Sequence, residues 1–193
     1  MHRIARALLP VALILAAPAP ASGQAPGSKF VALIGGAVHS DLGSFVNTDG
    51  RWGGTAGILF GVNTSWSSFT LEGNWIQKGD ESTHLDYIEV PVTVGRVMLL
   101  RDGKTRGRLY TGLSLGFKTS CESEVLDCDL AEDTELGLPL GFQFATVRGA
   151  NSFIGIDVRY SFPLIEVYDD LNAHNRPWQF RLMFGRTLGR SSP

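Results

Sequence analysis

The sequence lacks any long apolar segment beyond its N-terminal residues, which limits how the chain could meet a membrane. After residue 23 no run reaches the 18 or more apolar residues that a transmembrane helix requires. No long segment shows helical periodicity with capping residues at its ends either. If such a chain enters a membrane, it must do so as a closed barrel of strands, because only helices and closed barrels satisfy their backbone polar groups in lipid.

Motifs for catalysis and for phosphate binding are also missing. The sequence contains no P-loop, no HExxH zinc motif and no GxSxG elbow. His39, Ser40 and Asp41 are adjacent in sequence, so they cannot meet as a triad on one extended strand. The alternative is a surface lipid hydrolase that uses loop residues, namely His84 or His174 with Ser82, Asp169 or Asp170. Loop residues of these types are usually turn formers, so we expect no enzyme and no cofactor.

Positive charge is scarce as well. The chain has 17 basic and 19 acidic residues, a formal net charge of −2. No basic stripe is present to neutralise phosphates, so we expect no nucleic-acid partner.

The N-terminus has the pattern of an export signal. Arg3 and Arg6 precede an apolar run over residues 7–17, and small residues follow in APAPASGQA. A membrane anchor is the alternative, but the run is short for a spanning helix. We predict a signal peptide over residues 1–23, a linker over 24–28 and one barrel domain over 29–190. Removing the signal lowers the basic count from 17 to 15 against 19 acids, which leaves a net charge near −4.

Only two cysteines are present, Cys121 and Cys128. An exported chain meets an oxidising compartment, so we predict a disulfide between them. A two-cysteine metal site is the alternative, but no histidine lies nearby at ligand spacing. The surrounding acidic residues are Glu122, Glu124, Asp127, Asp129, Glu132 and Asp133. They suggest a loop that binds Ca²⁺, or Mg²⁺ together with lipid, but the spacing does not match an EF-hand. We therefore favour an acidic loop pinned by the disulfide, with no metal site.

The sequence does contain a regular series of extended segments. In YIEVPVTVG, Ile88, Val90, Val92 and Val94 share one face of a strand. Eight such runs occur, most of them long enough to cross a bilayer at a tilt: Phe30–Val38, Trp52–Val62, Ser68–Gln77, Leu85–Leu99, Arg108–Thr119, Thr134–Val147, Ser152–Phe162 and Trp178–Leu188. Short breaks alternate with longer ones. The pattern predicts an all-β fold, an eight-stranded antiparallel up-and-down transmembrane β-barrel with both termini in the periplasm.

The polar faces of these runs indicate a narrow interior rather than a solvated surface. The whole chain has four lysines, none of which falls mid-strand in the predicted runs, and the polar faces are rich in glycine. An eight-stranded lumen that is filled by side chains favours small residues. The charges on these faces are Glu72, Glu89, Asp157, Arg159 and Arg181. Because a buried charge needs a partner, we predict a lumen network in which the two arginines neutralise the carboxylates.

Two further features bear on the barrel. Aromatic residues near the strand ends predict interfacial girdles: Trp52, Trp66, Trp75, Tyr160, Phe162 and Trp178. Pro91 and Pro139 lie inside strands, where each removes a ladder hydrogen bond. We expect a bulge at each proline, or a strand boundary that excludes it.

The segments TLEGNWIQKG (Thr70–Gly79) and LDYIEVPVTV (Leu85–Val94) resemble the paired-strand signature of the outer membrane protein beta-barrel domain family, often labelled porin-family. The runs YTGLSLGF and FIGIDVRYS are similar to later strands of that family, so the resemblance covers about residues 29–188. It implies a small OmpA/OmpX-type eight-stranded barrel and no particular activity. The ending departs from the common pattern, because Phe184 is followed by GRTLGRSSP rather than by a terminal aromatic.

These observations lead to one expectation with two alternatives. We expect a monomeric, structural or interaction protein of the bacterial outer membrane, which contacts lipid and, through its extracellular loops, envelope or host molecules. We expect no general pore, because eight strands leave a lumen only wide enough for side chains. The alternatives are a soluble lipocalin-like barrel around a hydrophobic ligand and an outer-membrane lipid-modifying enzyme.

Overall fold

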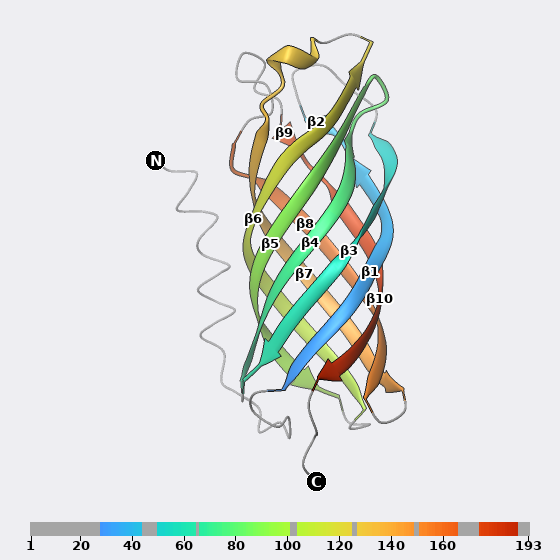
Figure 1. Ribbon diagram of the computed structural model, residues 1–193, viewed down its shortest axis with the longest axis vertical. Helices are drawn as coiled ribbons and strands as arrows, with labels where there is room; N and C mark the ends of the chain where they lie inside the picture. Colours follow the sequence, from blue (N-terminus) through green and yellow to red (C-terminus); the bar gives the residue numbers. More distant parts are fainter. Residues whose placement is uncertain are drawn as a thin grey trace.

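Segments of alternating polarity become the strands of a closed antiparallel barrel in the computed structural model (Figure 1). The structure describes residues 28–43, 50–64, 66–100, 104–124, 127–148, 151–165 and 174–188. The barrel strands are β1 (Lys29–Ser40), β3 (Arg51–Asn63), β4 (Ser67–Gly79), β5 (Thr83–Leu99), β6 (Thr105–Ser123), β7 (Thr134–Arg148), β8 (Ser152–Pro163) and β10 (Trp178–Leu188). Each of the eight predicted runs coincides with one of these strands to within a few residues, so the predicted fold class is confirmed.

Chain neighbours pair around the wall, and β1 closes the barrel by pairing with β10. The closing register runs from Lys29 opposite Leu188 to His39 opposite Trp178. The start of β1 and the end of β10 therefore lie at the same end, which is the lower end in Figure 1. The predicted signal peptide and the linker residues up to 27 lie outside the described residues. No helix among the described residues is long and apolar enough to cross a membrane.

Connections differ between the two ends. The lower end has three short connections, over residues 64–66, 100–104 and 149–151. The upper end has one short connection, over 80–82, and three longer ones, over 41–50, 124–133 and 164–177. Two further elements, missed in the sequence, lie in the upper connections. The strands β2 (Leu42–Gly43) and β9 (His174–Asn175) pair with each other, and a 3-10 turn, η1, spans Cys128–Leu130.

The upper connection between β4 and β5 is a tight turn, shorter than the break between the predicted runs Ser68–Gln77 and Leu85–Leu99. Gly79 has φ of +111°, a backbone conformation that side chains other than glycine rarely adopt. The buried Asp80 holds the turn, because its Oδ1 accepts hydrogen bonds from the Ser82 and Thr83 backbone N–H groups at 2.9 and 2.8 Å.

Side chains alternate between two environments along every strand. In β5, Ile88, Val90 and Val92 point outward with 41%, 37% and 56% of their surface exposed, whereas Tyr87 and Glu89 are buried in the lumen. The apolar face of YIEVPVTVG is thus the outer face of the barrel.

The expected bulges at the two prolines are wrong. Pairing of β4 with β5 has the same register on both sides of Pro91, and pairing of β6 with β7 has the same register on both sides of Pro139. The one register shift between β5 and β6 lies at Asp86/Tyr87. Each proline therefore interrupts a ladder locally without displacing the strand, because its neighbours on either side still pair.

Candidate functional site

The lumen holds a cluster of buried charges at mid-height. We call Glu72, Arg108, Tyr110, Asp157, Arg159 and Arg181 the central cluster; they come from β4, β6, β8 and β10, and none is more than 5% exposed. Glu72 is held between two arginines, with its Oε1 at 2.5 Å from Arg159 Nη2 and its Oε2 at 2.9 Å from Arg181 Nη1. Arg159 and Arg181 thus each have a carboxylate partner, as a charge in a low-dielectric interior requires.

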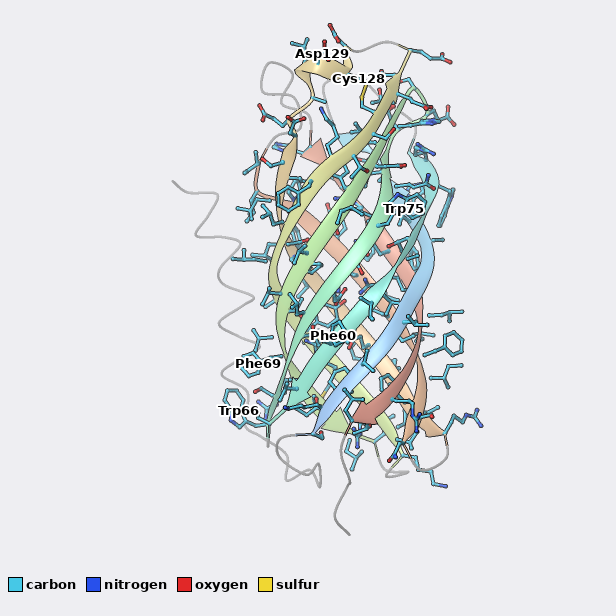
Figure 2. All side chains as sticks on the ribbon, viewed as in Figure 1. Phe60, Trp66, Phe69, Trp75, Cys128 and Asp129 are labelled. Carbon is cyan, nitrogen blue, oxygen red and sulfur yellow. A yellow bond between two sulfur atoms is a disulfide. The ribbon has the colours of Figure 1, made fainter. Side chains whose placement is uncertain are left out.

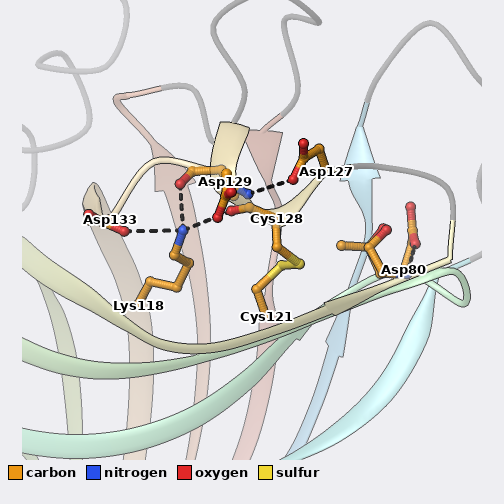
Figure 3. Close-up of a disulfide and its surroundings, with 10 residues drawn as sticks. Asp80, Lys118, Cys121, Asp127, Cys128, Asp129 and Asp133 are labelled. Carbon is orange, nitrogen blue, oxygen red and sulfur yellow. Dashed lines mark hydrogen bonds and ion pairs between the residues drawn. A yellow bond between two sulfur atoms is a disulfide. The ribbon is translucent and has the colours of Figure 1, made fainter.

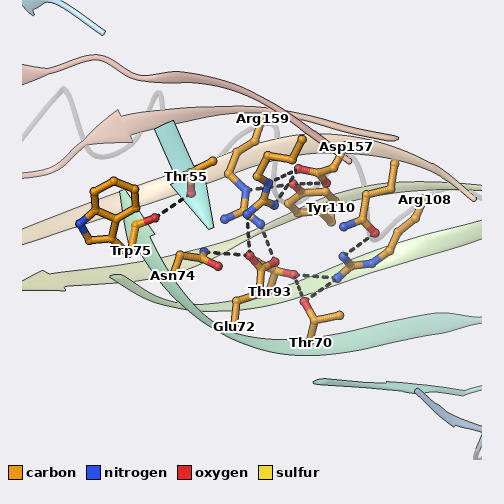
Figure 4. A network of polar contacts seen from close by, with 12 residues as sticks. Thr55, Thr70, Glu72, Asn74, Trp75, Thr93, Arg108, Tyr110, Asp157 and Arg159 are labelled. Carbon is orange, nitrogen blue, oxygen red and sulfur yellow. Dashed lines mark hydrogen bonds and ion pairs between the residues drawn. The ribbon is translucent and has the colours of Figure 1, made fainter. Parts of the chain in front are cut away.

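Asp157 and Tyr110 extend these pairs into a continuous network (Figure 4). Asp157 Oδ1 accepts from both Arg181 Nε and Arg181 Nη2, at 2.9 and 2.7 Å, so one carboxylate oxygen receives two charge-assisted hydrogen bonds. The Tyr110 hydroxyl donates to Asp157 Oδ2 at 2.8 Å and accepts from Arg159 Nε at 2.9 Å. Four of the five residues predicted for the lumen network, Glu72, Asp157, Arg159 and Arg181, therefore meet here.

Arg108 joins the central cluster without a carboxylate of its own. It donates to Thr93 Oγ1 at 2.7 Å and to Gln143 Oε1 at 3.2 Å, and it lies over the ring of Tyr110 with 4.5 Å to the centroid. Neutral acceptors and an aromatic face stabilise this cation. The central cluster consequently holds three arginines and two carboxylates.

Glu89 lies elsewhere, contrary to the prediction that arginines neutralise it. It pairs with Lys78 in what we call the upper cluster, formed by Lys78, Glu89, Glu135 and Asn175. Lys78 Nζ is 2.8 Å from Glu135 Oε1, and Asn175 Nδ2 donates to Glu135 Oε2 at 3.2 Å. This cluster has one cation and two carboxylates, the opposite imbalance to the central cluster.

Four residues of the two clusters were not predicted as members of a lumen network, namely Lys78, Arg108, Tyr110 and Glu135. Lys78 lies just beyond the predicted run Ser68–Gln77, whereas β4 continues to Gly79 and carries Lys78 into the lumen with none of its surface exposed. A signal for all four residues was present, because each shares the period-two face of residues already assigned to the interior.

Apolar residues fill the lumen above and below the central cluster. The lower group consists of Ala32, Ile34, Leu59 and Met183, against which Phe30, Ala145 and Phe153 pack. The upper group consists of Val38, Ile76, Leu85, Tyr87 and Ala131, with Cys121 against it. Ala131 and Asn175 belong to connections between strands, so these two residues reach the upper end of the lumen.

Glycines make room for the aromatic side chains of the lumen. A Cβ atom at Gly61 would overlap the ring of Phe30, and one at Gly185 would overlap the ring of Phe153. In the central cluster the ring of Tyr110 lies against Gly141 in the same way. The glycine-rich inner face therefore reflects close approach of rings to backbone.

The disulfide lies at the upper rim (Figure 3). Cys121 of β6 is bonded to Cys128 of η1, which closes a loop with a sequence separation of 7. Lys118 binds the segment over residues 128–133. Its Nζ donates to the carbonyl oxygens of Cys128 and Ala131 at 3.3 and 2.5 Å and lies 3.1 Å from Asp133 Oδ1. In the part of the chain that the structure describes, no three His, Cys, Asp or Glu side chains are placed to hold a metal ion.

Three of the residues considered for catalysis, His39, Ser40 and Ser82, have structural partners. His39 packs edge-on against Trp52, with 5.0 Å between ring centroids, and Ser40 Oγ donates to the Gly79 carbonyl at 2.9 Å. Ser82 Oγ donates to Asp80 in the tight turn at 2.9 Å. His84 is exposed in β5, and His174 lies in β9. Asp169 and Asp170 lie outside the described residues.

The outer wall is apolar and edged by aromatic side chains. Figure 2 shows Trp66 and Phe69 near the lower end and Trp75 in the upper half. Trp52 and Trp178 are exposed on the upper part of the wall, at 63% and 47%. Trp178 packs against Tyr160, and Tyr160 against Phe162. All six residues predicted for the girdles therefore lie near a strand end.

Charges outside the lumen separate by sign between the two ends. Cations at the lower end are Lys29, Arg96, Lys104, Arg106, Arg148 and Arg186, and no Asp or Glu occurs among the residues described at this end. The described acids of the upper end are Asp41, Asp80, Glu81, Asp86, Glu122, Glu124, Asp127, Asp129, Glu132 and Asp133. Three cations accompany them, Arg51, Lys118 and Arg176.

Comparison with solved structures places the fold among small outer-membrane barrels. The chain is 15% identical to Neisserial surface protein A, with a TM-score of 0.61 over 82% of this chain and 97% of that one. It is 13% identical to the N-terminal barrel domain of Pseudomonas aeruginosa OprF, with a TM-score of 0.55 over 86% of this chain and all (100%) of the other. Ail, the attachment invasion locus protein of Yersinia pestis, is also 13% identical, with a TM-score of 0.54 over 85% and 100%.

At these identities the likeness shows the fold alone. No family model matches the sequence, and the search of curated proteins finds no match. The resemblance inferred from the strand motifs is thus confirmed at the level of the eight-stranded barrel.

Proposed function

We propose that this chain is a small monomeric protein of the bacterial outer membrane that crosses the lipid as a barrel and presents its upper connections outside the cell. Its role is structural or interactive rather than catalytic. The short connections and the two ends of the barrel domain face the periplasm in this arrangement.

One observation carries the proposal, which is the inversion of polarity across the barrel wall. Large apolar side chains such as Leu33, Val92 and Leu113 are exposed on the outer face at 65%, 56% and 55%, whereas Glu72 and Arg159 are 1% exposed inside. In water an apolar surface of this extent would aggregate, because soluble monomers rarely expose large contiguous apolar patches. In lipid it is the face that an outer-membrane barrel requires.

The same inversion disfavours a soluble lipocalin-like binder. A hydrophobic ligand in the lumen would have to replace the ion pairs of Glu72, Asp157, Arg159 and Arg181, which would leave buried charges without partners. Apolar layers lie above and below these charges.

We infer from this filling that the barrel is not a general pore. A path for solutes would have to pass the lower apolar group, both charged clusters and the connection residues over the upper end. Eight-stranded barrels have an interior just wide enough for side chains to fill.

The acidic upper rim suggests the kind of contact that the exposed connections make. Ten described acids there are accompanied by three cations, so the rim attracts cationic groups of envelope or host molecules. The solved structures named above include an attachment protein, but identities of 13–15% carry no such role to this chain.

The experiment that tests the proposal is an SDS gel of unboiled and boiled samples from the outer-membrane fraction. A folded membrane barrel resists SDS until it is heated, so we expect the protein in this fraction with a heat-dependent change of apparent mass. A soluble periplasmic protein whose apparent mass does not change on heating would contradict contact with lipid. Planar-bilayer recordings on the same sample test the inference about conductance, which large steady current steps would contradict.

A further inference from the structure

The outer wall has a groove at the lower end of the barrel, where the first and last strands meet. Its volume is about 1060 Å³. Its lining includes Val31 and Leu33 of β1, Phe184 and Arg186 of β10, Ile154 of β8 and Arg148 of β7. The groove therefore combines two arginines with apolar side chains on the face that we assign to lipid.

Strand register brings the two arginines into one row. Arg186 of β10 is opposite Ser152 of β8, and Ser152 is opposite Arg148 of β7. Since neighbouring strands are about 4.8 Å apart, the two arginine Cα atoms are separated by roughly 10 Å. All three side chains are exposed, and the small Ser152 is the residue between the two arginines in this row. Two planar guanidinium forks at this spacing can converge on one phosphate group.

The next row of the wall is apolar. Leu33 is opposite Phe184, and Phe184 is opposite Ile154. Leu33 and Phe184 are exposed at 65% and 55%. A molecule whose phosphate lies on the arginine row would therefore lay a hydrocarbon chain along these side chains, toward the middle of the membrane.

The charge of the groove has no compensation within the described chain. Arg148 and Arg186 form no ion pair with any residue that the structure describes, and the described part of the lower end contains no Asp or Glu. Cations at the border of the hydrocarbon region can reach the headgroup layer, where they attract anionic lipid headgroups. The groove consequently selects a ligand that brings both a negative charge and an acyl chain.

We propose that this groove binds an anionic phospholipid of the periplasmic leaflet, with its phosphate between Arg148 and Arg186 and an acyl chain against Leu33, Phe184 and Ile154. This inference rests on the proposed outer-membrane function. It adds a specific lipid site to a barrel that would otherwise contact lipid only as solvent.

The test uses the full chain, purified from membranes in dodecyl maltoside. Short-chain phosphatidylglycerol, phosphatidylcholine with the same acyl chains, and inorganic phosphate are titrated separately, and the amide NMR signals of Ser152 and Arg186 report binding. The variant R148Q/R186Q removes both charges. The matched control is R96Q, because Arg96 is a cation of the same end on β5, four strands from β10 in either direction around the barrel.

We expect phosphatidylglycerol to bind at least tenfold more tightly than phosphatidylcholine or inorganic phosphate. R148Q/R186Q should weaken that binding at least tenfold, and R96Q should change it less than twofold. Equal losses in both variants would mean diffuse attraction to the whole cationic end and would overturn the site. If inorganic phosphate bound as tightly as phosphatidylglycerol, the apolar row would have no part in binding, and the lipid site would be overturned.

The wild-type comparison of the three probes stands even if the double variant does not fold. Each sample is also run unboiled and boiled on an SDS gel. Wild-type protein that shows the heat-dependent shift but no preference for phosphatidylglycerol refutes the lipid site alone. Wild-type protein that shows no shift refutes the proposed function, and the lipid site with it.

Discussion

Replacing Glu72 by glutamine probes the ionic interior of the barrel with the smallest change of shape. The substitution keeps the volume and removes the negative charge that lies between Arg159 and Arg181. These contacts measure 2.5 and 2.9 Å, and both arginines are almost fully buried. The central cluster would change from three cations and two anions to three cations and one anion.

The expected loss of stability follows from these contacts. Breaking a buried ion pair by removing one partner costs about 3–5 kcal/mol, because the other charge stays buried. Hydrogen bonds to charged groups contribute about 1.5–3 kcal/mol each, and the glutamine oxygen can still accept one of the two. We therefore expect Glu72→Gln to lower the free energy of unfolding by about 3 kcal/mol, toward the lower end of the range for a buried pair.

The assay is reversible urea unfolding from lipid vesicles, followed by tryptophan fluorescence. All four tryptophans lie on the outer wall, so their emission reports contact with lipid. Glu81→Gln, in the exposed upper turn, is the control and should stay within about 0.5 kcal/mol of wild type. Combining Glu72→Gln with Arg181→Met should be less damaging than the sum of the single changes, by about 2 kcal/mol. A loss below about 1 kcal/mol for Glu72→Gln, or strict additivity, would refute the ionic network as described.

Three further predictions concern the wall and the upper rim. Val92→Arg, at the middle of β5, should lower stability in vesicles by about 2–4 kcal/mol, and a negligible effect would show that this face does not meet lipid. Gly79→Ala should lower stability by about 1–3 kcal/mol because of its positive φ, and Gly73→Ala, where a Cβ has open space, should be much milder in the same unfolding assay. Cys121→Ser should lower it by about 2 kcal/mol, the loop-entropy value for so short a loop. Reducing the wild-type protein should give the same unfolding midpoint as Cys121→Ser. A wild-type midpoint that does not change on reduction would argue against the disulfide.

The strands were predictable because the period of two is strong wherever one face meets lipid and the other a packed lumen. Apolar residues at every second position of β5, β8 and β10 leave little doubt about which segments are extended. Strand ends were harder to predict, because Lys78 lies just beyond the apolar run of β4. A charged residue at such a margin is typical of a loop, although the strand carries it inward.

Partners across the lumen were not predictable in the same way. The period of two indicates which residues point inward, but it does not indicate how high along the barrel axis each residue lies. Height depends on the stagger of strands around the closed barrel, which no single strand encodes. Glu89 therefore seemed a partner for Arg159 or Arg181, whereas the barrel places it beside Lys78. The same limit explains why Tyr110, which bridges Asp157 and Arg159, could be assigned to the interior but not to the network.

The two charged layers of the lumen are complementary as well as separate. The central cluster has an excess of one positive charge through Arg108, and the upper cluster has an excess of one negative charge through Glu89 and Glu135. Together their eight ionised side chains sum to zero, which matters because buried apolar groups share the lumen with them. A charge removed from one layer therefore unbalances both. The outer face follows another rule, because its charges are confined to the two ends, where headgroups and water can compensate them.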